Sequence, residues 1–205
     1  MAHELVLVLD FGGQYNQLIA RRVREHKIYC EVKSYKTPVE EIRAMNPKGI
    51  IFTGGPNSVY LEDSPRMPKE IFDIGVPILG ICYGAQFMAY SLGGEICTAQ
   101  DSSLSEFGRT ETFVETGSRL FKGIEDTTVT WMSHNDYIKT LPEGFKVIAH
   151  TAKCPYAGIV NSAKRFYGVQ FHPEVNHTER GFDMLGNVLY EVCGCAGDWT
   201  MESYA

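Results

Sequence analysis

Cys82 stands at the centre of the segment with the clearest chemical pattern in the sequence. Glycines lie two residues before and two residues after it, in Gly80-Ile81-Cys82-Tyr83-Gly84, between an apolar run and an amphipathic stretch. This is the spacing of a nucleophile elbow, a sharp turn from a strand into a helix that leaves no room for side chains at the flanking positions. A helix N-terminus also offers positive potential and free N–H groups, which favour a reactive thiolate. We therefore predict that Cys82 is a nucleophile, with a buried structural cysteine as the alternative.

His172 and Glu174 follow another apolar run and supply the other groups that such a nucleophile needs. A cysteine nucleophile needs a base that takes its proton and later returns it, and the base needs an acceptor on its second ring nitrogen. In extended backbone, residues two apart project to the same side, so the Glu174 carboxylate can reach the His172 ring. His134 is a second candidate for the base. We favour a role in shaping the site, because Asp136 is the only carboxylate close to it in the sequence.

These residues must be positioned by strands that end near one another, and the first half of the chain has the corresponding pattern. Short β-branched apolar runs alternate with amphipathic stretches, which is typical of a parallel sheet with crossover helices. Thr37 and Glu40 form a capping box around Pro38, so we expect a helix to begin there. The predicted strands lie at 5–9, 29–35, 49–53 and 76–81. Two further helices are predicted at about 14–26 and 85–92.

The second half of the chain changes to β-rich runs separated by turns. These runs cover about 110–115, 128–132, 146–151 and 165–171, and a helical stretch follows over about 179–192. Glu106 and Arg109 fall in a polar segment that we expect to be a solvated loop. No repeat or linker is evident, so we predict a single α/β domain over 1–205 with a mostly parallel central sheet, flanking helices and additional antiparallel strands.

The composition excludes several classes of protein. The 205 residues include 19 basic and 25 acidic side chains, a formal net charge of −6, with 44% hydrophobic and 21% charged residues. This balance suits a globular domain, and the negative charge argues against a nucleic-acid or anionic-membrane surface. We expect the one basic cluster to be a solvated helix face: Arg21, Arg22, Arg24 and Lys27.

The cysteines and the N-terminus predict a cytoplasmic protein with reduced thiols. The first apolar run is too short for a signal peptide or a membrane span. The six cysteines are scattered, and the only close pair, Cys193 and Cys195, is a weak metal signal. We therefore predict no metal site.

The order Cys82, His172, Glu174, with Gly54-Gly55-Pro56 before the elbow, resembles the class I (triad) glutamine amidotransferases over nearly the whole chain. Within that family the sequence is similar to the glutaminase domains of GMP synthetases. The segments that carry this similarity are 9–15, 17–25, 131–134, 170–178, and 193–195 followed by Trp199. Two positions depart from the usual pattern, since Asn135 stands where the family often has Gly and Gly13 where many relatives carry Ser.

The resemblance implies a flavodoxin-like fold and the hydrolysis of L-glutamine to glutamate and ammonia through a thioester on Cys82. It implies that His172 acts as acid and base, that Glu174 orients it, and that backbone N–H groups of Gly55 and Tyr83 form an oxyanion hole. By the same resemblance, four residues hold the ends of the substrate: Gln86, Ser133, His134 and Asn135.

The resemblance also implies a partner. Ammonia would pass to an ATP pyrophosphatase, a synthetase domain or subunit that aminates XMP to GMP. We expect no cofactor in this domain, and ATP and Mg²⁺ only on the partner, because the chain has neither a GxxxxGK[ST] loop nor a Ser-Gly-Gly-x-Asp-Ser segment. Three alternatives stay open: an amidotransferase of another pathway, such as anthranilate or CTP synthesis, a γ-glutamyl peptidase, and a non-catalytic binding module, which the intact triad disfavours.

Overall fold

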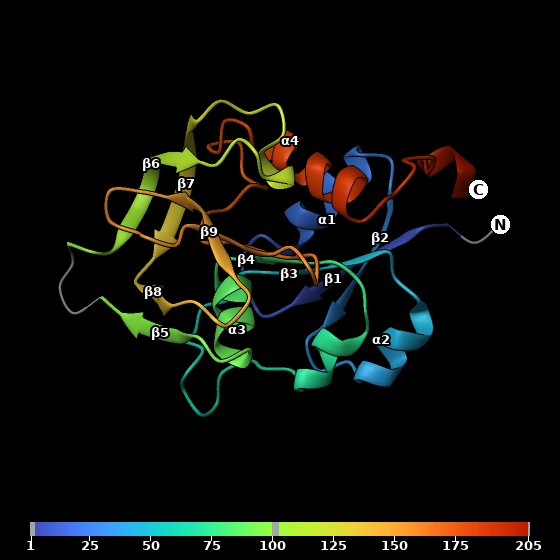
Figure 1. The fold of residues 1–205 in the computed structure, drawn as a ribbon. Coiled ribbons are helices and arrows are strands. Elements are labelled where there is room, and N and C mark those ends of the chain that lie inside the picture. The colour runs from blue at the N-terminus through green and yellow to red at the C-terminus, as the bar shows by residue number, and fades with distance from the viewer. Residues whose placement is uncertain (1–2, 100–102, 205) are drawn as a thin grey trace.

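The computed structural model describes residues 3–99 and 103–204, and in this part of the chain the strands form a nine-stranded and a two-stranded sheet (Figure 1). The large sheet has the order β2-β1-β3-β4-β11-β10-β9-β6-β7. Its first five strands pair in parallel, and the remaining pairs are antiparallel. In the order of the sheet, the strands are β2 Tyr29–Ser34, β1 Leu5–Asp10, β3 Gly49–Phe52, β4 Ile78–Ile81, β11 Phe166–Val169, β10 Gly158–Asn161, β9 Lys146–His150, β6 Glu106–Val114 and β7 Thr127–His134.

The small sheet pairs β5 Glu95–Thr98 with β8 Asp136–Thr140 in antiparallel register. The helices are α1 Asn16–Glu25, α2 Val39–Met45, α3 Tyr83–Ser91 and α4 Gly181–Gly186, and a π-helical segment, Asn187–Val192, continues α4. Short 3₁₀ helices cover Lys69–Asp73, Arg119–Phe121 and Met201–Tyr204. Figure 1 shows α1 and α4 on one side of the parallel strands, with α2 and α3 on the other.

The parallel strands are buried because helices cover both of their faces. Alternate residues of β1 enter different apolar clusters: Val6 and Val8 pack in the cluster that includes α1 and α4, whereas Leu7 and Leu9 pack with α2 and α3. Successive residues of a strand point to opposite faces of the sheet, so a strand between two helical layers has apolar residues at consecutive positions. The sequence of β1 is such a continuous apolar run.

The predicted α/β fold with a parallel sheet, flanking helices and additional antiparallel strands is confirmed. The capping prediction is wrong, because α2 begins at Val39 and no side chain caps it. The loop prediction for Glu106 and Arg109 is also wrong, because both lie in β6. The short strands β5, β8 and β10 were not predicted. Among the described residues, no helix has the length and apolar character that a membrane crossing requires.

Candidate active site

The candidate site is a cavity of about 320 Å³ lined by the segments that follow β1, β3, β4 and β11. The carboxyl ends of parallel strands are where α/β sheets usually bind ligands. The hairpin of β7 and β8 supplies a further wall. All nine residues predicted to form the site line this one cavity: Gly55, Cys82, Tyr83, Gln86, Ser133, His134, Asn135, His172 and Glu174.

Cys82 occupies a strained turn between β4 and α3. Its φ and ψ angles are 54° and −109°, in a region that side-chain-bearing residues rarely adopt. A Cβ at Gly80 would lie 2.6 Å from the carbonyl oxygen of Gly84, and one at Gly84 would lie 2.6 Å from that of Phe52. The Cys82 N–H donates to the carbonyl of Val169 over 2.8 Å, which ties the turn to β11. The glycine spacing therefore does form an elbow, and it presents the thiol at the start of a helix.

His172 is held from several directions beside this turn. Its Nδ1 lies 2.6 Å from Oε1 of Glu174, and its backbone N–H donates to the Trp131 carbonyl over 3.0 Å. The Thr178 hydroxyl donates to the His172 carbonyl over 2.6 Å. The ring packs edge-on against Tyr15, with 5.5 Å between ring centroids. These contacts fix the ring, and the His172 side chain also hydrogen-bonds with the Cys82 side chain.

The electrostatics of the pair favour a charged imidazole. Burial of the ring opposes its charged form, but hydrogen bonds with Cys82 and Glu174 and the charges of both outweigh this, and they raise the pKa of His172 from 6.5 to about 11. Glu174 is only 1% exposed, and its Oε2 has no hydrogen-bond partner among the described residues. An imidazolium between a buried carboxylate and a thiol is the arrangement that supports a reactive thiolate.

Arg22 holds the segment that carries Glu174. Its Nε donates to the Glu174 carbonyl over 2.9 Å, and Nη2 donates to Oδ1 of Asn176 over 2.8 Å. The interpretation of the basic cluster as a solvated face is therefore wrong for Arg22, whose side chain is 18% exposed. One member of the cluster anchors the loop after β11.

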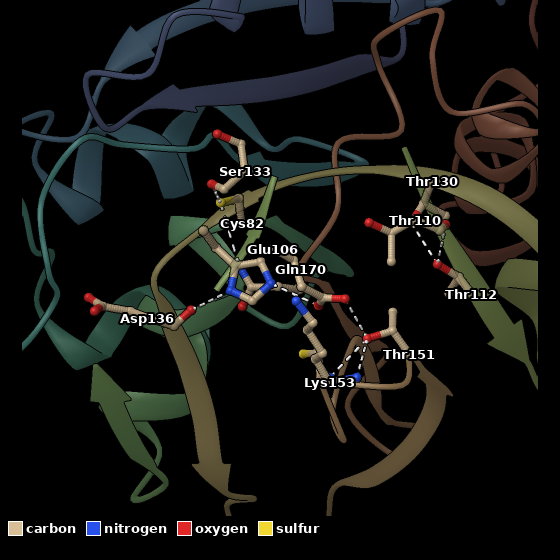
Figure 2. Close-up of polar contacts among 12 residues, drawn as sticks. Cys82, Glu106, Thr110, Thr112, Thr130, Ser133, Asp136, Thr151, Lys153 and Gln170 are labelled. Atoms are coloured by element: carbon tan, nitrogen blue, oxygen red, sulfur yellow. Dashed lines mark hydrogen bonds and ion pairs between the residues drawn. The ribbon is translucent and has the colours of Figure 1, made fainter. Parts of the chain in front are cut away.

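His134 has a carboxylate partner that is remote in the sequence. Its Nε2 lies 3.2 Å from Oε1 of Glu106, and its Nδ1 lies 2.9 Å from the Asp136 carbonyl. The Thr151 hydroxyl donates to the other oxygen of Glu106 over 2.8 Å (Figure 2). We expected His134 not to be the base because Asp136 was its only nearby carboxylate in the sequence, and that reason is wrong. His134 is still disfavoured as the base, because both of its ring nitrogens contact partners other than Cys82.

Glu106 and His134 also belong to a group with the chemistry of metal ligands. Together with Cys154 they offer ligand atoms that all lie within 4.8 Å of one another. Burial and the nearby Glu106 raise the pKa of the Cys154 thiol to about 12, so the thiol stays protonated at neutral pH. Glu106 is engaged by hydrogen bonds with His134 and with the Thr151 hydroxyl, so we treat the group as a hydrogen-bonded network.

The proposed substrate contacts alternate along the β7–β8 hairpin. Ser133 and Asn135 are exposed, whereas His134 and Asp136 are buried. The Cys82 thiol lies 3.8 Å from the Ser133 carbonyl oxygen (Figure 2). The hairpin thus brings two polar side chains and a carbonyl group to the cavity beside the candidate nucleophile.

The loops after β1 and β3 approach each other closely at the cavity. A Cβ at Gly13 would collide with the Gly54 carbonyl oxygen, and one at Gly55 would lie 2.8 Å from the Phe11 carbonyl oxygen. Gly13, which stands where many relatives carry Ser, therefore lies at a point where the backbone leaves no room for a side chain. Gly55 lines the cavity next to Tyr83, because a Cβ at Gly55 would lie 3.1 Å from Cγ of Tyr83. Tyr83 is the first residue of α3, so its N–H has no acceptor within the helix.

Gln170 is a site residue that was not predicted. Its Nε2 lies 3.5 Å from the Cys82 sulfur, and its Oε1 accepts a hydrogen bond of 3.1 Å from Gln86. The two-residue spacing rule used for His172 and Glu174 also includes Gln170, but the extended backbone that it assumed is wrong, because residues 170 and 171 form a bend and residues 173 and 174 a turn. That signal was present in the sequence.

Comparison with known proteins finds relatives of the whole chain. Residues 7–192 match the family model described as glutamine amidotransferase class-I. Proteins named GMP synthase (glutamine-hydrolyzing) from Clostridium botulinum and Alkaliphilus metalliredigens are 59% and 58% identical to the chain over 204 residues. These alignments cover 100% of this chain but 39% of each relative.

Solved structures agree on the fold. A Thermoplasma acidophilum protein, described as one of the subunits of a GMP synthase, matches with a TM-score of 0.80 at 29% identity, over 95% of this chain and 96% of that one. A glutamine amidotransferase from Thermotoga maritima matches with a TM-score of 0.75 at 19% identity, over 94% and 99% of the two chains.

Proposed function

Since the chain belongs to the class-I glutamine amidotransferase family, we propose that it hydrolyses L-glutamine to glutamate and ammonia. The observation that carries this proposal is the meeting of three groups at one cavity: Cys82 on a strained elbow, and His172 held by Glu174 beside it. The nucleophile, the proton carrier and the orienting carboxylate all come from this chain. Its part of the reaction needs no cofactor.

The proposed reaction has two stages. The Cys82 thiolate attacks the side-chain amide carbon of glutamine, and His172 gives a proton to the nitrogen as the C–N bond breaks, which releases ammonia and leaves a γ-glutamyl thioester. His172 then takes a proton from water as the water attacks the thioester, and the C–S bond breaks to release glutamate. In both stages the developing oxyanion lies between the N–H groups of Gly55 and Tyr83. One such donor is typically worth about 2.7–4 kcal/mol in barrier height.

The remaining cavity residues are proposed to hold the ends of glutamine. Ser133 and Asn135 are exposed on the wall next to Cys82, where they can meet the amino and carboxylate groups. Gln86 and His134 are buried, and hydrogen bonds to the Asp136 carbonyl engage both. Their contribution is therefore to shape this wall as well as to contact substrate.

The ammonia is proposed to serve a partner. The chain covers 39% of the length of its curated relatives, which are named GMP synthase. We place ATP, Mg²⁺ and the amination of XMP to GMP on a synthetase domain or a separate synthetase chain, and we take residues 1–205 as a single glutaminase domain. All six cysteines are free thiols, which fits the reducing cytoplasm.

Ammonia release, measured with and without a synthetase partner from one of these relatives, tests the proposal. We expect weak glutamine hydrolysis by the chain alone, a higher rate with the partner, and no release by Cys82→Ala in either case. Release that persists in Cys82→Ala would refute the triad. Hydrolysis that never supports GMP formation would favour another pathway or a γ-glutamyl peptidase, and the absence of any hydrolysis would favour a binding module.

A further inference from the structure

Gln170 is a buried polar side chain beside the candidate nucleophile that the proposed reaction leaves without a role. It is 1% exposed and follows directly after β11. Its amide joins two site residues, because Nε2 lies 3.5 Å from the Cys82 sulfur and Oε1 lies 3.1 Å from Nε2 of Gln86. Burying an amide is costly unless it is hydrogen-bonded, and these two contacts are the ones that satisfy the Gln170 amide.

A carbonyl group that cannot donate a hydrogen bond fixes the orientation of the Gln170 amide. The Asp136 main-chain oxygen accepts from Gln86 Nε2 over 3.0 Å. Because a carbonyl only accepts, Gln86 must turn its NH₂ group toward it. The second N–H of that group then points to Gln170, which must present its oxygen in return. The NH₂ group of Gln170 is therefore the end that faces the sulfur.

Besides its hydrogen bond with His172, the Cys82 sulfur has two polar contacts that suit different protonation states. The Ser133 carbonyl, at 3.8 Å, can accept from a thiol and offers nothing to a thiolate. The Gln170 N–H can donate to a thiolate, and hydrogen bonds to a charged partner are stronger than those to a neutral one. One contact thus suits the resting thiol, and the other suits the state that reacts.

We propose that Gln170 is a catalytic residue that donates a hydrogen bond to the Cys82 sulfur and stabilises its thiolate, with Gln86 and the Asp136 carbonyl holding its amide in the donating orientation. This role rests on the proposed function, in which Cys82 is the nucleophile. The thiolate occurs twice in that reaction, before the attack on glutamine and again when the C–S bond of the thioester breaks. Gln170 therefore acts in both stages.

The other titratable groups around the sulfur stay the same when Gln170 is changed. They are His172, with Glu174 behind it, on the segment after β11, and Cys154, next to Glu106, on the segment after β9. A change in the pH dependence of Cys82 reactivity on substitution of Gln170 alone is therefore assigned to the lost donor.

The test is the rate at which iodoacetamide alkylates Cys82 across pH without glutamine, located by peptide mass spectrometry. Gln170→Met keeps the length of the side chain and removes the donor, and Gln170→Glu keeps its shape and places a carboxylate oxygen against the sulfur. We expect alkylation at neutral pH to fall about tenfold or more in Gln170→Met and further in Gln170→Glu, with the midpoint of the pH profile about one unit higher. Gln17→Glu, which adds the same charge on an exposed position of α1, is expected to match the wild type.

Two further readouts keep the outcomes distinct. Gln86→Met leaves Gln170 in place but frees its amide to turn, so a smaller decrease in alkylation is expected even if the Gln170 variants fold poorly. If folded Gln170 variants alkylate at the wild-type rate and pH midpoint while the wild type hydrolyses glutamine, the role of Gln170 is wrong and the proposed function stands. If Cys82 of the wild type reacts no faster than the other cysteines and no ammonia is released, the proposed function fails, and the role of Gln170 fails with it.

Discussion

Replacing Glu174 with Gln separates the charge of the proposed triad from its shape. The Glu174 carboxylate is 1% exposed, and Oε1 lies 2.6 Å from Nδ1 of His172. Gln can accept the same hydrogen bond but carries no charge, so the variant removes the attraction between the carboxylate and the imidazolium. Breaking a buried ion pair costs about 3–5 kcal/mol. That figure is a loss of folding stability, and we take it as the upper bound on the stabilisation that the carboxylate gives to the charged imidazole in the transition state. At about 1.4 kcal/mol per factor of ten, we therefore expect kcat to fall by at most about 10²- to 10⁴-fold.

The assay is the initial rate of glutamate formation at saturating glutamine, with near-UV circular dichroism to verify the fold. Glu179→Gln is the matched control, because Glu179 also pairs with a cation, Arg109, at 2.8 Å, but the pair is about half exposed. Exposed ion pairs contribute little, so this control should keep the wild-type rate. A folded Glu174→Gln variant with the wild-type kcat would refute the reasoning that the buried charge stabilises the imidazolium.

Three further predictions concern the elbow and the imidazole. In urea denaturation, the Cys82→Gly variant should be more stable than the Cys82→Ala variant by about 1 kcal/mol, because glycine adopts a φ of 54° without strain. A more stable Cys82→Ala variant would contradict the backbone strain at this position. By thermal denaturation, Gly84→Ala should lower Tm sharply, since its Cβ would lie 2.6 Å from the Phe52 oxygen, whereas Gly117→Ala, with nothing within 4 Å, should not; equal Tm values would contradict the packing. Because the pKa of His172 is raised from 6.5 to about 11, its charged ring stabilises the fold fully below pH 6.5, and this contribution is lost as pH rises through about 11. Imidazole nitrogen NMR should show the imidazolium at neutral pH, and a ring that titrates near 6.5 would contradict this.

The triad positions could be predicted because each depends on a local pattern. The glycines around Cys82 and the two-residue spacing of His172 and Glu174 act within single segments, and the apolar runs of the parallel strands give the sheet that joins those segments. The same spacing rule extends to Gln170, so that residue was within reach of the sequence and was missed.

The partner of His134 could not be predicted in the same way. Glu106 lies directly opposite His134 in the antiparallel register of β6 and β7. That register depends on pairing across a long connection, which local periodicity does not specify. The Arg22 contact with Glu174 spans 152 positions, and nothing in the helical pattern separates Arg22 from its solvated neighbours. The strands β5, β8 and β10 each contain only two apolar residues, whereas β3, β4 and β11, with four residues each, contain three, so no apolar run marks the former.

The most direct test of the central claim is covalent capture of Cys82 with a chloroketone analogue of glutamine. The analogue carries the amino and carboxylate groups of the substrate, so it tests the cavity and the nucleophile together. We predict one adduct, located by peptide mass spectrometry on Cys82, that forms in parallel with the loss of ammonia release and is slowed by glutamine. An adduct on another residue, or hydrolysis that continues after Cys82 is fully modified, would contradict the account.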